Sequence, residues 1–115
     1  MYGEFRLAGQ PLVAMDSAQN HSFAFSEGIS LIVDATSQAE IDALWNGLSA
    51  VPEAEQCGWL KDRYGLSWQV VPDAELNRML QDPDEERVIR VLNAMFGMKK
   101  IDLAELRRAA GDGAG

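Results

Sequence analysis

The first 35 residues of the chain alternate apolar and polar side chains, whereas the last 45 repeat apolar residues at helical spacing. Residues 2–7 place Gly3, Phe5 and Leu7 between polar neighbours, and a second apolar run follows at residues 12–15. The Ala-Gly-Gln-Pro sequence between the two runs is typical of a turn. We therefore predict a β-hairpin over residues 2–15.

Three more strands are predicted from similar patterns. Residues 29–35 alternate after a polar loop at residues 16–20. Residues 57–62 and 66–71 flank a Tyr-Gly turn, which predicts a second hairpin.

A helix is predicted to begin at Ser37. Ser37 and Glu40 form an S-x-x-E capping box, in which the hydroxyl accepts from a first-turn amide and the carboxylate accepts from the serine N–H. The helix then carries one apolar stripe: Ile41, Leu44, Trp45 and Leu48. We expect this stripe to pack on the back of the sheet, because a one-sided apolar helix needs an apolar surface to cover.

Two further helices are predicted after the last strand. The first opens at Pro72 and carries apolar residues at helical spacing. For the second, we predict Asp82 as the N-cap, Pro83 at the first helical position and Gly97 as a left-handed stop.

A last short helix is predicted from Asp102 to Gly111, and the glycine-rich residues 111–115 predict a frayed end. Strands gather in the front of the chain and helices in the back. This order indicates the α+β class.

The length and the net charge of the chain limit its domain organisation and its possible partners. A chain of 115 residues forms one domain. The formal charge of −8 disfavours nucleic acid and anionic membranes as partners. One cysteine cannot form an internal disulfide, and neither a signal peptide nor a long apolar run is visible. We therefore expect a cytoplasmic protein.

Common catalytic motifs are absent from the sequence, including phosphate loops, paired cysteines and nucleophile elbows. His21 is the only histidine, and we interpret it as a solvated loop residue. Cys57 is interpreted as a packing residue. A cluster of four acidic residues is interpreted as structural rather than metal-binding, because acidic side chains cap a helix start and complement the helix dipole there. These residues are Asp82, Asp84, Glu85 and Glu86.

Two tryptophans, a tight turn and an apolar strand crowd into residues 57–72, which read CGWLKDRYGLSWQVVP. This segment resembles the signature of the PhnB-like family, also labelled demethylubiquinone methyltransferase-like, of the vicinal oxygen chelate (glyoxalase/bleomycin resistance/dioxygenase) superfamily. Further matches lie on both sides: ISL at residues 29–31, SQAEID at 37–42, Trp45, Leu48 and AMFGMKKID at 94–102. The resemblance covers about residues 22–110.

This resemblance implies paired βαβββ modules whose strands curve into a half-open cup around a small-molecule cavity. One module can be placed from residue 29 onward, whereas the chain begins at the third strand of the first module. We therefore expect a single domain over residues 1–115, with a curved mixed sheet and C-terminal helices, that lacks the opening strand and helix. Either the sequence is a truncated fragment or a partner chain supplies the missing edge. Because uncovered edges tend to pair, we expect a homodimer with strand exchange or edge pairing.

The resemblance also places Gln69 where metal-binding members of the family usually have a glutamate ligand. Alternation puts Ser67 and Gln69 on one face of their strand. On the matching strand, the usual histidine position falls at Gly28, and Ser30 follows on the same face. We therefore predict Ser30, Ser67 and Gln69 as ligand-binding residues. Alternatively, Ser30 and Gln69 are buried polar residues satisfied by neighbouring strands.

No complete set of metal ligands is visible in the chain. The early strand offers Asp16 or Ala14 at the position of a further family ligand, and the two alignments are equivalent. Neutral amide and hydroxyl groups bind divalent cations weakly, so we expect a divalent metal only if a partner chain contributes ligands.

Three functions remain. We favour a small-molecule-binding protein whose cavity is lined by the three predicted residues and walled by aromatic side chains. The alternatives are a glyoxalase-like or dioxygenase-like metal enzyme and a structural module without a ligand. Methyl transfer is rejected, because the adenosyl donor needs a glycine-rich strand-to-helix turn and a larger sheet.

Overall fold

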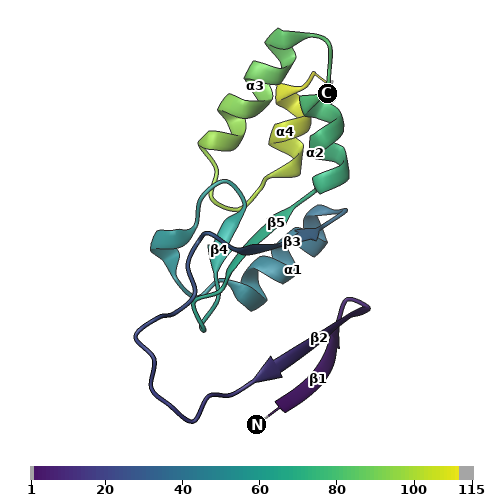
Figure 1. Cartoon of the computed structure of the whole chain (residues 1–115). Helices are drawn as coiled ribbons and strands as arrows, with labels where there is room; N and C mark the ends of the chain where they lie inside the picture. The colour runs from purple at the N-terminus through teal and green to yellow at the C-terminus, as the bar shows by residue number, and fades with distance from the viewer. Residues whose placement is uncertain (1, 112–115) are drawn as a thin grey trace.

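A computed structural model describes residues 2–111 of the chain. It contains a two-stranded hairpin, a three-stranded sheet covered by one helix, and three C-terminal helices (Figure 1). The predicted α+β class and the mixed sheet are confirmed. The predicted frayed end at residues 112–115 lies outside the described residues.

The N-terminal hairpin consists of β1 (Tyr2–Leu7) and β2 (Gln10–Met15), paired antiparallel as predicted. Ala8 and Gly9 form the turn in the left-handed region, with φ of 51° and 80°. The second strand begins earlier than the predicted apolar run and includes Pro11. Proline has no N–H to donate to a neighbouring strand, and it is tolerated here because β2 is an edge strand.

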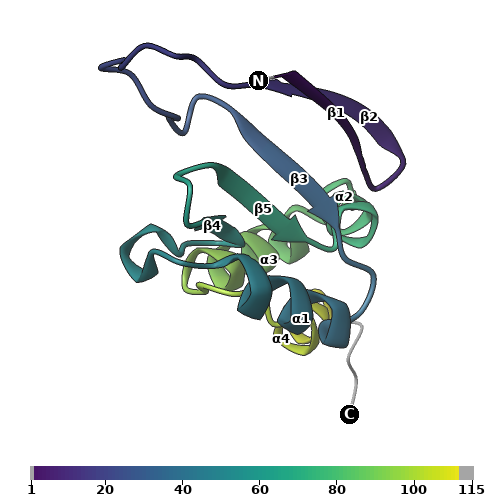
Figure 2. The same ribbon diagram turned by 90° about the horizontal axis from the view of Figure 1, so that it is seen from below.

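The hairpin lies apart from the rest of the molecule, as Figure 2 shows. Every residue of β1 is exposed, and β2 has one half-buried residue, Leu12. The radius of gyration is 16.8 Å, and the longest dimension is 56 Å. A compact domain of this size has a radius of about 13 Å. The chain therefore consists of a packed body and a projecting arm.

The sheet of the body has the strand order β3-β5-β4. β3 (Ser30–Asp34) runs parallel to the central strand β5 (Ser67–Val71), and β4 (Trp59–Lys61) runs antiparallel to it. A parallel pair needs a crossover connection. Helix α1 (Gln38–Leu48) provides it.

Helix α1 covers one face of the sheet through Ile41 and Trp45, which are both buried. Ser37 caps the helix as predicted, accepting from the Glu40 N–H at 3.2 Å. The other hydrogen bond of the predicted capping box, from the Ser37 N–H to the Glu40 carboxylate, is wrong. The Glu40 carboxylate accepts instead from the backbone N–H and the hydroxyl of Thr36, at 3.3 and 3.2 Å.

Three α-helices follow the sheet: α2 (Asp73–Leu80), α3 (Glu85–Phe96) and α4 (Leu103–Ala109). A short 3-10 turn, η1 (Pro52–Ala54), precedes β4. Figure 1 shows α2, α3 and α4 together beyond one end of the sheet. Buried Leu76, Val91 and Leu106 extend the core into this layer.

Three details predicted for helix α3 are wrong. Pro83 is not the first helical residue, because α3 begins at Glu85 and Pro83 lies before its N-cap. Asp84 caps this helix, accepting from the N–H groups of Glu86 and Arg87, whereas Asp82 accepts from the Asp84 N–H and closes the preceding turn. Gly97 does not form a left-handed stop, since its φ is −87°. For α4, Asp102 caps the helix as predicted.

Among residues 2–111, no helix combines the length and the apolar character that crossing a membrane requires.

Candidate functional site

The sheet has one face against α1 and one face without a helix. Leu60, Trp68 and Val70 pack in or against the core on the helix side. The register pairs Ser30 with Ser67 and Ile32 with Gln69. It also pairs Gln69 with Trp59. Because side chains alternate along each strand, these residues belong to the opposite face. We call this surface the open face, defined by Ser30, Ile32, Trp59, Lys61, Ser67 and Gln69.

A hydrogen bond joins two of the predicted site residues on the open face. The Gln69 Nε2 donates to the Ser30 Oγ at 3.0 Å, and both side chains are half-buried. This bond uses one of the two amide protons of Gln69. The carboxamide oxygen of Gln69 can still accept, and the Ser30 hydroxyl can still donate. The second amide proton of Gln69 can also donate, so the pair offers one acceptor and two donors side by side.

Ser67 lies deeper than the other two predicted residues. The residue is 2% exposed, and its strand neighbours in the register are Ser30 and Lys61. A molecule on the open face would meet Ser30 and Gln69 before it met Ser67. Ligand contact by Ser67 therefore stays a prediction.

The surroundings of the Ser30–Gln69 pair are apolar and electrically balanced. Ile32 is 57% exposed, and Trp59 is half-buried. At the rim, the Lys61 Nζ donates to the Glu27 Oε1 at 2.8 Å. This hydrogen bond lowers the pKa of the Glu27 carboxyl below its ordinary value. Around the Ser30–Gln69 pair, the open face therefore suits a neutral molecule with a polar group better than an ion. Asp34 adds a negative charge to the same face only at the far end of β3.

The donor set does not fit the metal ion that the superfamily often uses. Within residues 2–111, no three His, Cys, Asp or Glu side chains gather closely enough to hold a cation. Gly28 has no side chain to offer, and the Gln69 amide already bonds to Ser30. Imidazole and carboxylate ligands would have to come from elsewhere. We therefore derive no chemical step through a metal ion.

Other reactive residues have local structural partners. His21 stacks on Phe23 with ring centroids 4.6 Å apart, and its Nε2 lies 2.8 Å from the Ser17 Oγ. Cys57 is half-buried in the left-handed region, with φ of 51°, and its backbone N–H donates to the Met98 carbonyl. Neither residue belongs to the open face.

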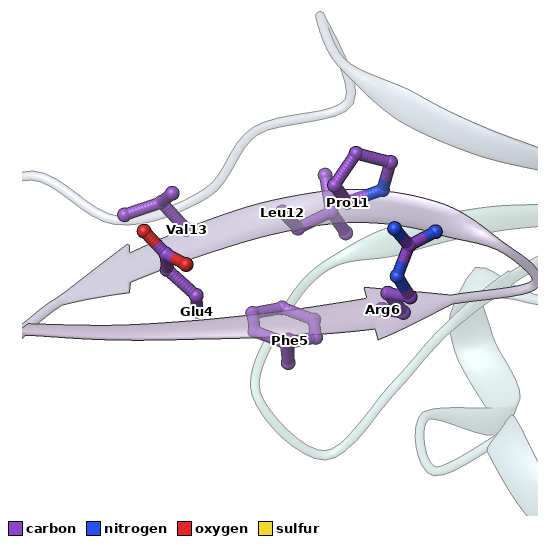
Figure 3. Close-up of a pocket in the computed structure, with 6 residues that line it drawn as sticks. All are labelled: Glu4, Phe5, Arg6, Pro11, Leu12 and Val13. Carbon is purple, nitrogen blue, oxygen red and sulfur yellow. The ribbon is translucent and has the colours of Figure 1, made fainter.

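Two surface hollows lie away from the predicted residues. One, of about 440 Å³, runs along the hairpin, where Glu4, Arg6, Pro11 and Val13 project to the same side (Figure 3). The other, of about 400 Å³, lies between the end of α1 and residues 62–64. Neither includes Ser30, Ser67 or Gln69. Ile32, which is 57% exposed, leaves the centre of the open face accessible to solvent.

Ile32 and Trp59 were not selected from the sequence, although the signal was present. Ile32 shares the alternation of Ser30, and Trp59 shares that of Lys61. Alternation alone did not show which residues of β4 lie opposite Gln69. That requires the antiparallel register of β4 and β5.

Comparisons with known proteins identify a matching family model and a similar solved structure. The family model described as 3-demethylubiquinone-9 3-methyltransferase matches residues 1–71. A solved structure described as a 3-demethylubiquinone-9 3-methyltransferase, a PhnB protein from Bacillus cereus, is 33% identical with a TM-score of 0.52. The match covers 62% of this chain and 64% of the Bacillus cereus chain, less than two thirds of its length. No curated protein matches.

Proposed function

The chain belongs to the 3-demethylubiquinone-9 3-methyltransferase family, also called PhnB-like, and from this premise we propose that it binds a small molecule on the open face. This family has the vicinal oxygen chelate fold. In the proposal, Ser30 and Gln69 contact the ligand and Ser67 supports them from beneath. The protein acts in the cytoplasm.

The Ser30–Gln69 hydrogen bond carries this proposal. It joins side chains from two strands and fixes both on one face of the sheet. The bond holds the free Gln69 oxygen and the Ser30 hydroxyl in a defined position before a ligand arrives, which reduces the entropy that binding costs. Exposed Ile32 and the Trp59 ring provide apolar contact beside the polar pair. This arrangement favours an uncharged ligand with neighbouring donor and acceptor groups.

Methyl transfer is not part of the proposal, although the family description names it. An adenosyl donor is bound at a glycine-rich turn between a strand and a helix. Here β3 connects to α1 through Ala35, Thr36 and Ser37, which include no glycine. The turn that follows the first parallel strand therefore does not have the required sequence.

Two-dimensional NMR of ¹⁵N-labelled protein tests the proposal with a library of uncharged amides and hydroxyketones. We expect binders that shift the Gln69 side-chain amide and the Trp59 indole signals. Gln69→Ala and Ser30→Ala should each weaken their binding at least tenfold. Asn93→Ala, an exposed substitution on α3, is the control and should leave binding unchanged. Equal binding by wild type and Gln69→Ala, or no binder at all, would overturn the proposal.

Metal analysis of the purified protein separates ligand binding from the metal-enzyme alternative. Bound nickel, zinc, iron or manganese in a fixed ratio, lost in Gln69→Ala, would support a glyoxalase-like or dioxygenase-like enzyme.

A further inference from the structure

An ion pair at the rim of the open face links two segments that are far apart in the sequence. The Lys61 Nζ donates to the Glu27 Oε1 at 2.8 Å. Lys61 belongs to β4, whereas Glu27 lies in the segment that leads into β3, and β5 separates these two strands in the sheet (Figure 2). Because Lys61 pairs with Ser67, the first residue of β5, the ion pair joins β4 to this segment across the start of the central strand.

Ser67 is the buried residue of the open face. The register places Ser30, Ser67 and Lys61 in one row across the three strands. Ser67, in the middle of this row, is 2% exposed, although Ile32 in the next row of the same face is 57% exposed. The cover over the open face therefore lies at the row that contains the ion pair.

The Lys61 side chain has the length and the position to provide this cover. It is 27% exposed, so its aliphatic stem lies along the sheet rather than in solvent. Neighbouring strands are about 4.8 Å apart, so about 10 Å separates β4 from β3. A lysine side chain directed toward Glu27 therefore has its stem over the central strand at Ser67. From the other side, the Gln69 amide, which donates to Ser30, limits access to the same residue.

The ion pair also affects which charge a ligand meets on the open face. The Glu27 carboxylate is 67% exposed and repels an approaching anion, while the Lys61 ammonium is already paired. An uncharged amide or hydroxyl is not subject to this repulsion. Asp34 adds a negative charge at the far end of β3, where its carboxylate accepts from the Asp73 N–H. Glu27 therefore opposes an anion close to the predicted ligand residues.

We propose that Glu27 and Lys61 determine the charge specificity of the open face. Their ion pair lies as a strap over Ser67 and keeps the face selective for uncharged ligands over anions of the same shape. Loss of the Glu27 charge frees the Lys61 ammonium and converts the same face into a site for a carboxylate. This inference rests on the proposed function, because it assigns the ligand class of the same site.

Titration of ¹⁵N-labelled protein with benzamide and benzoate, which have the same shape, tests the charge specificity. The Gln69 side-chain amide signals give the dissociation constants. We expect wild type to bind benzamide at least fivefold more tightly than benzoate. Glu27→Gln should tighten benzoate binding at least fivefold and change benzamide binding less than twofold.

Glu86→Gln is the matched control for this titration, since it removes the same charge from an exposed residue of α3. It should leave both constants unchanged. Exposed ion pairs contribute little to stability, so Glu27→Gln should fold as wild type does. A ratio of the two constants that Glu27→Gln does not change would overturn the proposal.

Alkylation measures the same specificity without a bound ligand. Ser30→Cys, combined with Cys57→Ser, is treated with iodoacetamide or with iodoacetate, which differ in charge. Both reagents react with the same thiolate, so the ratio of their rates reports the charge of the surroundings rather than the ionisation of the thiol. Glu27→Gln should raise the iodoacetate rate relative to the iodoacetamide rate at least threefold, and Glu86→Gln should not. An unchanged ratio in both variants would overturn the proposal.

The strap itself is tested at Ser67. Ser67→Cys, again combined with Cys57→Ser, is alkylated with iodoacetamide at alkaline pH, where the thiol is ionised. Lys61→Ala should raise the rate at least tenfold. Lys100→Ala, which breaks the ion pair of Lys100 with Asp42 instead, should change the rate less than twofold. Equal rates with and without the Lys61 side chain would show that another element covers Ser67, which would overturn the proposal.

The proposed specificity and the proposed function fail separately. If Glu27→Gln changes the alkylation ratio but no uncharged ligand shifts the Gln69 amide signal, the charge specificity stands and the binding proposal is wrong. If uncharged ligands bind and Glu27→Gln changes neither ratio, the binding proposal stands and the charge specificity is wrong.

Discussion

The hairpin arm and the body use the same strand pattern but end in opposite environments. Residues 2–15 form two regular strands with exposed side chains, whereas Leu60 and Val70 on the body strands are almost fully buried. The difference lies in the packing partner, since α1 packs on the body strands, whereas no element of residues 2–111 buries the side chains of the hairpin. In this molecule, an alternating pattern therefore predicts that a strand forms but not that its apolar side chains are buried.

The largest expected contrast comes from truncating a leucine in each region. Leu106 in α4 is completely buried, and Leu106→Ala should lower the free energy of unfolding by about 2–5 kcal/mol. Leu7→Ala in the hairpin should cost less than about 1 kcal/mol in dilute protein, because Leu7 is 40% exposed. Urea denaturation measures both variants. Equal losses would contradict the division into body and arm.

Two glycines with positive φ provide the next comparison. A Cβ at Gly58 would lie 2.8 Å from the Val71 Cγ1 and 3.1 Å from the Ile101 Cγ1, and φ there is +87°. Gly58→Ala should therefore cost about 2–4 kcal/mol. Gly9 has φ of +80° in the hairpin turn with open space around it. Gly9→Ala should leave the unfolding of the body unchanged, as followed by tryptophan fluorescence.

Acid should weaken the body through Asp62. Burial raises the pKa of its carboxyl, but hydrogen bonds from Trp68, Tyr64 and Leu66 outweigh burial and lower the pKa below its ordinary value. A lowered pKa in the folded state contributes stability above the unfolded pKa of about 3.9, and that stability is lost as the pH falls through the folded pKa.

We therefore expect Asp62→Asn to flatten the loss of stability below about pH 4, and Asp62→Ala to cost about 1–2 kcal/mol at neutral pH. Asp16→Asn, in the segment between β2 and β3, is the control. Urea denaturation across the acid range checks this, and an unchanged pH profile in Asp62→Asn would exclude Asp62 as the titrating group.

The smallest effect concerns the start of α3. Asp84→Ala removes the side chain that accepts from Glu86 and Arg87, and should cost about 1 kcal/mol. Asp84→Asn retains a capping oxygen and should cost only a few tenths of this value. Thermal unfolding compares the two. Equal stability of Asp84→Ala and wild type would show that the cap is not needed.

Local features were predicted best from the sequence. The hairpin, the cap at Ser37 and the turn at Gly65 depend on residues within a few positions of one another. The errors at Asp82 and Gly97 are also local. An aspartate before a proline suits both a helix cap and a turn, and a glycine after a helix can retain helical φ.

The candidate site was only partly predictable. The family resemblance selected Gln69 and Ser30, and alternation placed Ser67 on the same face as Gln69. The hydrogen bond between Ser30 and Gln69 joins residues 39 positions apart, and no periodicity within either strand specifies their register. The burial of Ser67 and the exposure of Ile32 likewise depend on packing from other elements.

The sequence by itself determined where strands, helices and turns form, because side-chain periodicity and capping act within one segment. It also determined the family, through an ordered series of matching residues. Only the tertiary structure decided that β5 lies between β3 and β4, that Gln69 donates a hydrogen bond to Ser30, and that the residues of β1 remain exposed. These features depend on contacts between distant segments, and an apolar alternation is the same whether or not another surface lies against it.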